Sequence, residues 1–252
     1  MPSRLGQNFL KDHKALERIA EVVEISKEDI VVEIGPGHGE LTRRLLKYGP
    51  KKLIGVELDE NLIKTFLVDL SQENESLTIV NSDIKTYLPK IKEKDYKLVG
   101  NIPYYLTSHL LRIISELQNK PSLIVLTVQK EVAERICATP PKMNLLAASV
   151  LYWGSPEIVR YISKNSFRPS PKVDSAIIKI IPAPRDMDEK RYFRLIKAIF
   201  SSPRKTLGNN LKGFGVKKEE IEKILEKIGL DGKSRPQDLT IDHIETILSS
   251  IK

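Results

Sequence analysis

Cysteine is nearly absent from the chain. Cys137 is the single cysteine among 252 residues, which excludes an intramolecular disulfide and any metal site built from several cysteines. One thiol suits a reducing compartment, and we interpret Cys137 as a small buried hydrophobe rather than a nucleophile. Neither His38 nor His109 has partners at metal-ligand spacing, so no zinc site is expected. The chemistry is therefore expected to need no metal.

Long apolar runs are absent as well. No stretch approaches the roughly 20 apolar residues that cross a bilayer, and the first fourteen residues lack the apolar core of a signal peptide. These absences predict a soluble, cytoplasmic protein without membrane contact. Nothing in the sequence demands an oligomer, and we expect a monomer.

Acidic residues are outnumbered. The chain has 41 Lys and Arg against 33 Asp and Glu, a net charge of +8 and a pI near 9.3. This balance favours a polyanionic partner such as nucleic acid. Charge alone fits a merely soluble basic surface equally well, so the choice depends on the motifs.

Short apolar runs alternate with amphipathic helical patterns along most of the chain. Helical spacing after Asp12, a predicted N-cap, indicates a first helix. Strands alternating with helices imply a parallel, doubly wound sheet. The last two strands are joined by a loop too short for a helical crossover and should pair antiparallel. We predict an α/β, Rossmann-like sheet of about seven strands with one reversed, near residues 30–34, 53–57, 77–80, 97–100, 122–128, 157–162 and 173–181.

A stiff break at Pro182-Ala-Pro184 separates this region from a different composition. Four helical patterns follow, near residues 188–200, 203–212, 217–228 and 240–251. We therefore predict a catalytic domain over residues 1–183 and a small helical domain over residues 184–252.

The turn after the first strand reads Glu33-Ile-Gly-Pro-Gly-His-Gly39. Glycine at Gly35 and Gly37 lets the backbone approach a ligand and adopt positive φ. A dinucleotide fingerprint wants Gly or Ala where Glu40 stands, which disfavours a pyrophosphate. S-adenosylmethionine has none, so it is favoured over a nicotinamide cofactor.

Two carboxylates follow the next strands. Glu57 ends the second strand, where a ribose diol would lie, and Asp83 follows the third, where an adenine amine would lie. In such sheets ligands bind outside the carboxyl ends of the strands. The alternative is that each acid only solubilises a strand end, but three successive strand ends carrying this pattern favour a cofactor site.

The fourth strand ends in Asn101-Ile-Pro-Tyr104. The exocyclic amine of adenine is a poor nucleophile because its lone pair is delocalised into the ring. The Asn101 oxygen and a backbone carbonyl beside Pro103 can accept its N–H bonds and localise that pair. Tyr104 can stack on the base, so that catalysis is mostly orientation and electrostatics. The alternative is an ordinary strand-exit turn.

Phe167 opens the stretch Phe167-Arg-Pro-Ser-Pro171, whose prolines stiffen the loop. A target base must be unstacked to reach a methyl donor, and an aromatic face would offset part of the lost stacking, about 1–3 kcal/mol per base. The alternative is a core phenylalanine that anchors the loop.

Together these pieces resemble the ribosomal RNA adenine N6,N6-dimethyltransferase family, the KsgA group and its relatives among the Erm resistance methyltransferases. The resemblance implies that Asn8 and Leu10 help to close the cofactor pocket with Gly35, Glu57, Asp83 and Asn101. It also implies that Asn101, Tyr104 and Phe167 frame the target adenine. The stretches that carry it are Gly6-Gln-Asn-Phe-Leu10, Glu33-Ile-Gly-Pro-Gly-His-Gly-Glu-Leu-Thr42, Asn101-Ile-Pro-Tyr-Tyr105, Gln129-Lys-Glu-Val-Ala-Glu-Arg135, Phe167-Arg-Pro-Ser-Pro-Lys-Val-Asp-Ser175 and Arg204-Lys-Thr-Leu207.

The tail looks closer to the KsgA branch. Ser202-Pro-Arg-Lys-Thr-Leu207 and Ser234-Arg-Pro-Gln-Asp-Leu239 favour that choice. The resemblance then implies dimethylation of two adjacent adenosines in the 3′-terminal hairpin of small-subunit ribosomal RNA, within a ribosomal particle, and a part in ribosome biogenesis. His109 departs from the proline that many relatives have there.

A basic surface is predicted in the tail, where residues 190–218 contain no Asp or Glu. Arg191, Arg194 and Lys197 fall at helical spacing close to one face, and Arg204 and Lys205 are expected to open the next helix. We predict that these five residues hold the RNA backbone. The alternative is a solvated face.

Other functions remain open from the sequence. One alternative is a large-subunit rRNA adenine methyltransferase of the Erm type. Another is a ribosome-assembly factor that binds RNA without methylating it, and a third is an adenine methyltransferase that acts on DNA.

Overall fold

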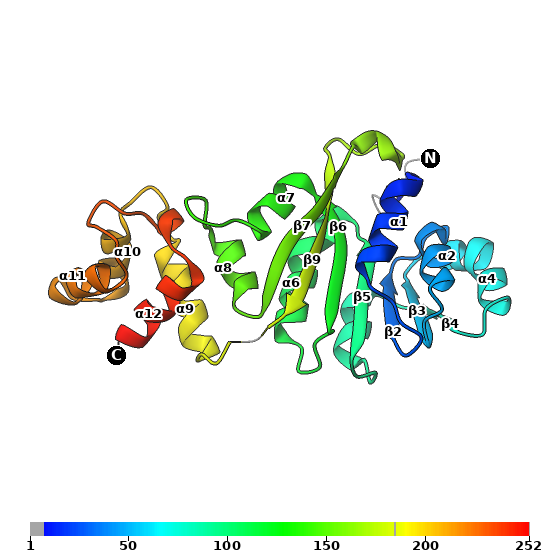
Figure 1. Cartoon of the computed structure of the whole chain (residues 1–252), viewed down its shortest axis with the longest axis horizontal. Helices are drawn as coiled ribbons and strands as arrows, with labels where there is room; N and C mark the ends of the chain where they lie inside the picture. The colour runs from blue at the N-terminus through cyan, green and yellow to red at the C-terminus, as the bar shows by residue number, and fades with distance from the viewer. Residues whose placement is uncertain (1–7, 184, 252) are drawn as a thin grey trace. The chain divides into compact units, whose positions relative to one another are not determined.

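The computed structural model describes residues 8–183 and 185–251 (Figure 1). Within these ranges the chain divides into two compact units. One consists of the residues up to Ala133 with Pro156–Pro182, and the other of Glu134–Ser155 with the residues from Ala183 onward. The first two residues of the family-like stretch 6–10, and Pro184 of the predicted break, lie outside the described residues.

A seven-stranded sheet forms the first unit, in the order β4-β3-β2-β5-β6-β9-β7 (Figure 1). The strands β4, β3, β2, β5 and β6 pair in parallel with one another, whereas β9, which lies between β6 and β7, is antiparallel to β6. The predicted α/β fold with one reversed strand is confirmed. The strands are β2 (Ile30–Ile34), β3 (Lys52–Glu57), β4 (Leu77–Asn81), β5 (Tyr96–Asn101), β6 (Leu123–Gln129), β7 (Gly154–Ile162) and β9 (Ser175–Pro182).

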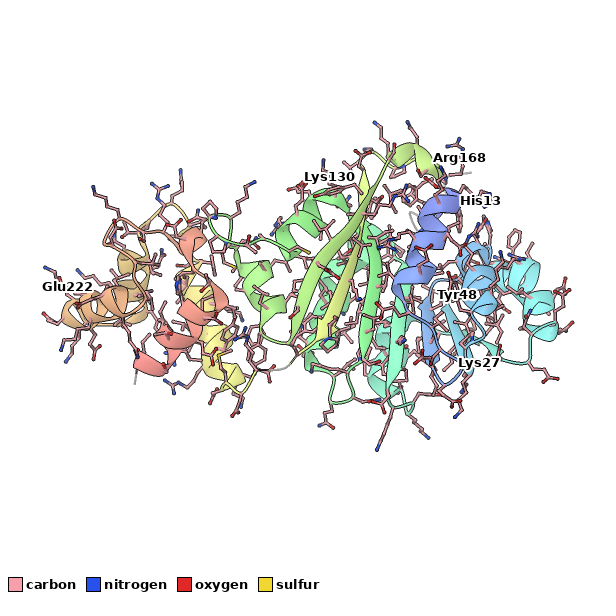
Figure 2. All side chains as sticks on the ribbon, in the orientation of Figure 1. His13, Lys27, Tyr48, Lys130, Arg168 and Glu222 are labelled. Atoms are coloured by element: carbon pink, nitrogen blue, oxygen red, sulfur yellow. The ribbon has the colours of Figure 1, made fainter. Side chains whose placement is uncertain are left out.

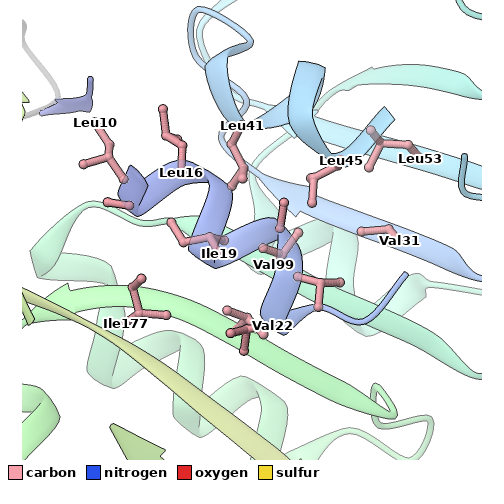
Figure 3. Packing of buried hydrophobic residues seen from close by; sticks show 14 of the residues in the cluster. Leu10, Leu16, Ile19, Val22, Val31, Leu41, Leu45, Leu53, Val99 and Ile177 are labelled. Carbon is pink, nitrogen blue, oxygen red and sulfur yellow. The ribbon is translucent and has the colours of Figure 1, made fainter. Parts of the chain in front are cut away.

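The helix α1 (His13–Val22) follows the predicted N-cap Asp12. The Asp12 side chain accepts a hydrogen bond from the Ala15 amide. The apolar face of the helix packs on α2 and the sheet, as Figure 3 shows for Leu16 and Ile19. Burying each such side chain stabilises the fold by about 1.5–3 kcal/mol. The other helices of this region are α2 (Glu40–Lys47), α3 (Glu60–Leu62), the π-helical turn η1 (Ile63–Leu67), α4 (Val68–Gln72), α5 (Ile84–Tyr87), α6 (Thr107–Glu116) and α7 (Lys130–Ile136).

A second, two-stranded sheet joins distant parts of the sequence. The strand β1 (Phe9–Leu10) pairs antiparallel with β8 (Phe167–Arg168), so that Leu10 lies opposite Phe167. The Lys11 amide extends the pairing by donating to the Ser166 carbonyl at 2.8 Å. Periodicity does not predict this sheet, because two residues show no alternation.

Helices form the second unit around a core of their own, in which Tyr192, Leu195 and Ile196 are buried. The predicted start of the second helix in the tail was wrong. It begins at Leu207 rather than near residue 203, because the Thr206 hydroxyl caps it by accepting from the Asn209 amide. The helices are α8 (Leu145–Leu151), α9 (Glu189–Ile199), α10 (Leu207–Phe214), α11 (Lys218–Lys227) and α12 (Ile241–Ser250). None of the helices within residues 8–183 and 185–251 combines the length and the apolar composition of a membrane span.

Candidate functional site

A cavity lies at the carboxyl ends of β2, β3 and β5, beside the turn after β4. In Figure 2 the label of Lys130, which follows β6, marks this carboxyl edge of the sheet. The label of Lys27, which precedes β2, marks the opposite edge. Every residue predicted to bind the cofactor or the target base lines this cavity, namely Asn8, Leu10, Gly35, Gly37, Glu57, Asp83, Asn101, Tyr104 and Phe167.

The glycine turn forms the floor of the cavity in a conformation that side chains disfavour. Gly35 and Gly37 have φ of +62° and +58°, in the left-handed region. A Cβ on Gly37 would come within 2.9 Å of the Phe9 ring. Glycine is therefore required here both by the backbone angle and by the segment packed over it.

Glu57 holds that turn in place. The residue is 4% exposed. Its carboxylate accepts hydrogen bonds from the amides of Gly37 at 3.0 Å, Leu58 at 2.8 Å and Asp59 at 2.9 Å. A carboxylate has about four acceptor positions. Glu57 therefore shapes the cavity and retains an acceptor for a ligand hydroxyl.

Asp83 caps α5 at the next strand end. Its Oδ1 accepts from the Lys85 amide at 2.9 Å, and its Oδ2 pairs with Lys85 Nζ at 3.1 Å. The side chain remains 29% exposed. Asp83 therefore serves as a helix cap and still presents a carboxylate at the cavity.

Asn101 ends β5 and links it to the N-terminal segment. Its Nδ2 donates to the Asn8 carbonyl at 3.0 Å. The oxygen and nitrogen of a carboxamide point apart, so Oδ1 faces away from Asn8, and no hydrogen bond within the described ranges uses it. Asn101 is thereby oriented to act as an acceptor.

Tyr104 lies one turn further, in η3 (Tyr104–Leu106). Its hydroxyl is 2.7 Å from Ser175 Oγ at the start of β9. Burial raises the pKa of Tyr104, the bond to Ser175 lowers it and Asp174 raises it, with a net rise. The side chain is therefore a neutral phenol at physiological pH, with its ring fixed at the cavity wall.

Phe167 lies at the boundary between cavity and core. It is 1% exposed and belongs to the hydrophobic cluster of Leu10, Leu16 and Ile177. This burial agrees with the alternative in which Phe167 anchors its loop, and its place in the cavity wall agrees with contact to a bound base. The stacking role stays a prediction.

The N-terminal segment packs over the glycine turn through contacts that the sequence did not predict. Phe9 stacks on His38 with ring centroids 3.9 Å apart, and His38 meets the edge of Phe66 at 4.4 Å. Lys11 forms an ion pair with Glu40 at the start of α2. Burial lowers the pKa of His38, Glu40 raises it and Lys11 lowers it, with a net fall, so His38 is neutral near pH 7.

Glu33 is a titratable residue of the cavity for which the sequence motifs predicted no role. It lies in β2, is 1% exposed and lines the cavity. Burial raises the pKa of Glu33 to about 8, with Thr42 lowering it and Glu57 and Glu40 raising it. The signal was an acid inside an otherwise apolar strand, Ile30-Val-Val-Glu-Ile34.

The predicted RNA-binding residues lie in the second unit. Arg191 Nη2 donates to the Ile251 carbonyl at 2.7 Å, and the Arg194 guanidinium lies 5.3 Å from the Phe214 ring centre. Lys197 is exposed on α9, and no ion pair within the described ranges engages it.

Arg204 and Lys205 are exposed in the turn before α10, not at its first residues. The expectation that they open the helix was therefore wrong. The described residues contain no group of three or more His, Cys, Asp or Glu that could hold a metal ion.

Comparisons with known proteins agree over almost the whole chain. The model of the family described as ribosomal RNA adenine dimethylase matches residues 2–252. Ribosomal RNA small subunit methyltransferase A of Clostridium acetobutylicum is 38% identical over 98% of this chain and 92% of its own length. The protein of that name from Clostridium botulinum strain Kyoto is 42% identical over 94% and 89%.

Solved structures agree with the fold. A dimethyladenosine transferase from Plasmodium falciparum superposes with a TM-score of 0.79 at 26% identity, covering 95% of each chain. The 23S rRNA methyltransferase ErmE superposes with a TM-score of 0.82 over 96% of this chain and 99% of its own. At 24% identity, this similarity supports the fold alone.

Proposed function

Because the chain belongs to the ribosomal RNA adenine dimethylase family, we propose that it dimethylates the N6 amines of two adjacent adenosines in the 3′-terminal hairpin of small-subunit ribosomal RNA. Membership makes it a methyltransferase enzyme that uses S-adenosylmethionine and has ribosomal RNA as substrate. The small-subunit assignment follows the name of the relatives at 38% and 42% identity. We further propose that the substrate is a small-subunit particle and that a monomer acts on it during ribosome biogenesis.

One observation carries the proposal. Residues from the N-terminal segment, the ends of four strands and the short strand β8 converge on a single cavity, and they are the residues that the motifs select for cofactor and adenine. Such convergence at the carboxyl edge of a doubly wound sheet is where ligands bind in this architecture. A cavity formed by chance would not recruit all of them.

The cavity suits the cofactor's chemistry. S-adenosylmethionine supplies an electrophilic methyl group on a sulfonium. The turn at Gly35 and Gly37 leaves room for a ligand beside its backbone, because no Cβ projects there. Glu57 has an acceptor left for a ribose hydroxyl, and Asp83 presents a carboxylate for the adenine amine. Asn8 and Leu10 close this side of the cavity.

The methyl acceptor requires orientation more than a base. Asn101 Oδ1 and the carbonyl of Ile102 accept the two N–H bonds of the adenine amine, which directs the nitrogen lone pair towards the methyl group. The Tyr104 ring, held by Ser175, supports the base from its face. After the transfer the nitrogen is positively charged and acidic, so it releases one proton to solvent water.

The test is mass mapping of methylated nucleotides after separate incubations with unmethylated small ribosomal subunits, large ribosomal subunits and DNA. Two adjacent dimethyladenosines in small-subunit RNA are expected. Modified large-subunit RNA alone would favour the Erm-type alternative, and methylated DNA the DNA enzyme. Binding of RNA and cofactor without methyl incorporation would favour an assembly factor.

Asn101→Ala separates chemistry from binding. It should lower the single-turnover rate at saturating cofactor by at least about tenfold, since one acceptor bond in the transition state is lost. Because Asn101 also holds the Asn8 carbonyl, cofactor affinity is measured in parallel. A wild-type rate at saturation would remove Asn101 from the methyl-transfer step.

A further inference from the structure

Glu33 has a buried carboxyl oxygen without a partner at the cofactor cavity. The side chain is 1% exposed and lines the cavity. No hydrogen bond reaches its Oε2 within the described ranges. The Thr42 hydroxyl on α2 is the neighbouring donor, and it lowers the pKa of Glu33. Buried polar groups normally find hydrogen-bond partners, so an oxygen of this kind beside a ligand cavity points to a partner that arrives with the ligand.

The charges around the cavity are mostly negative. Its charged lining residues are Glu33, Glu40, Glu57, Asp83 and Lys85. Lys85 pairs with Asp83, and Lys11 of the N-terminal segment pairs with Glu40. No ion pair in the described ranges engages Glu33 or Glu57.

Among the described residues, the elements around Glu33 supply no cation to compensate its charge. The strand β3 contributes Glu57, the helix α2 contributes Glu40 and Thr42, and β5 contributes the neutral Asn101. Glu57 is stabilised by three backbone amides. Among the acids that line the cavity, Glu33 therefore has the fewest cations and hydrogen-bond donors to stabilise a negative charge.

Before a ligand enters, that acid is expected to be neutral. An isolated carboxylate is strongly disfavoured away from water. The pKa of Glu33, raised to about 8, agrees with this placement. In the absence of ligand, Glu33 is therefore a neutral carboxylic acid at pH 7, whereas a bound cation would favour its carboxylate form.

We propose that Glu33 is a proton-coupled counterion for the positive charge of the cofactor: when S-adenosylmethionine enters, the Glu33 carboxyl releases its proton to solvent and the carboxylate then neutralises the bound cation. This rests on the proposed function, because S-adenosylmethionine is the ligand. One O–H bond breaks, and the proton passes to water or buffer. The net positive charge of the cofactor replaces the proton, so the cavity's total charge is nearly unchanged.

The number of protons released follows from the usual effect of a nearby charge on the pKa of a carboxyl group. A nearby opposite charge lowers the pKa of a carboxyl by about 1–3 units. A fall of about two units from a pKa near 8 releases roughly 0.8 proton per cofactor bound at pH 7, and little below pH 5 or above pH 9. The same linkage strengthens cofactor binding by up to about 100-fold as pH rises across that interval.

Calorimetry of cofactor binding in buffers of different ionisation enthalpy measures the released protons. Wild type should release roughly 0.8 proton more at pH 7 than Glu33→Gln. Protons exchanged by His38 or by the cofactor's own amine occur in both proteins and cancel. Glu75→Gln, which changes an exposed glutamate outside the cavity, should behave as wild type.

Infrared difference spectroscopy on wild type supplies a readout that needs no folded variant. The carboxylic-acid C=O band should disappear when cofactor binds. Tight binding with no excess proton release and no loss of that band would overturn the proposal and leave the proposed function standing. Absence of cofactor binding by wild type would overturn both.

Discussion

Replacing Glu33 by glutamine should stabilise the cofactor-free protein progressively as pH rises. The pKa of Glu33 is about 8 in the folded chain, against 4.5 for an ordinary glutamate. Between these values the folded chain binds more protons than the unfolded chain, so the free energy of unfolding falls as pH increases. Glutamine keeps the size of the side chain and removes the titration.

The magnitude follows from the two pKa values. At pH 7 the unfolded glutamate is ionised and the folded one is mostly protonated, which destabilises the wild type by about 3 kcal/mol relative to a group that does not titrate. At pH 5 the same difference is about 1 kcal/mol. The advantage of Glu33→Gln should therefore grow by roughly 2 kcal/mol between pH 5 and pH 7.

Hydrogen exchange of the β2 amides is the appropriate assay. The single tryptophan, Trp153, belongs to the other unit, so its fluorescence does not report on β2. Glu75→Gln serves as the control and should track wild type at both pH values. A stability difference between Glu33→Gln and wild type that stays constant from pH 5 to pH 7 would show that Glu33 is ionised in the folded chain and refute the reasoning.

Three further outcomes are expected. Glu57→Ala should weaken S-adenosylmethionine binding about 10–100-fold in calorimetry, since at least one charge-assisted hydrogen bond to the cofactor is lost. Unchanged cofactor affinity together with a lower Tm would show that Glu57 only holds the glycine turn. Phe167→Leu should slow methylation more than Phe167→Tyr if the ring stacks on the target base. Equal losses of activity in the two variants, with equally lowered Tm, would support the alternative in which Phe167 only anchors its loop. Charge reversal at Arg204 and Lys205 should weaken RNA binding and flatten the slope of log affinity against log salt by about 0.7–0.9 per lost phosphate contact, without changing cofactor affinity. A wild-type slope would place the RNA elsewhere.

The sequence by itself determined the alternation of strands and helices, because apolar runs and helical spacing are local signals. It also located the glycine turn and the acids at the strand ends, since a parallel sheet brings all its carboxyl ends to one edge. The cap at Asp12 is equally local and was predicted for the same reason.

Only the tertiary structure decided how distant segments meet. The pairing of Leu10 with Phe167 and the place of residues 134–155 in the helical unit depend on contacts far apart in the chain, which no periodicity records. Glu33 shows the physical reason most directly. Its residue type specifies an acid, but whether that acid carries a proton depends on the burial and on the charges of Glu40 and Glu57 that folding brings around it.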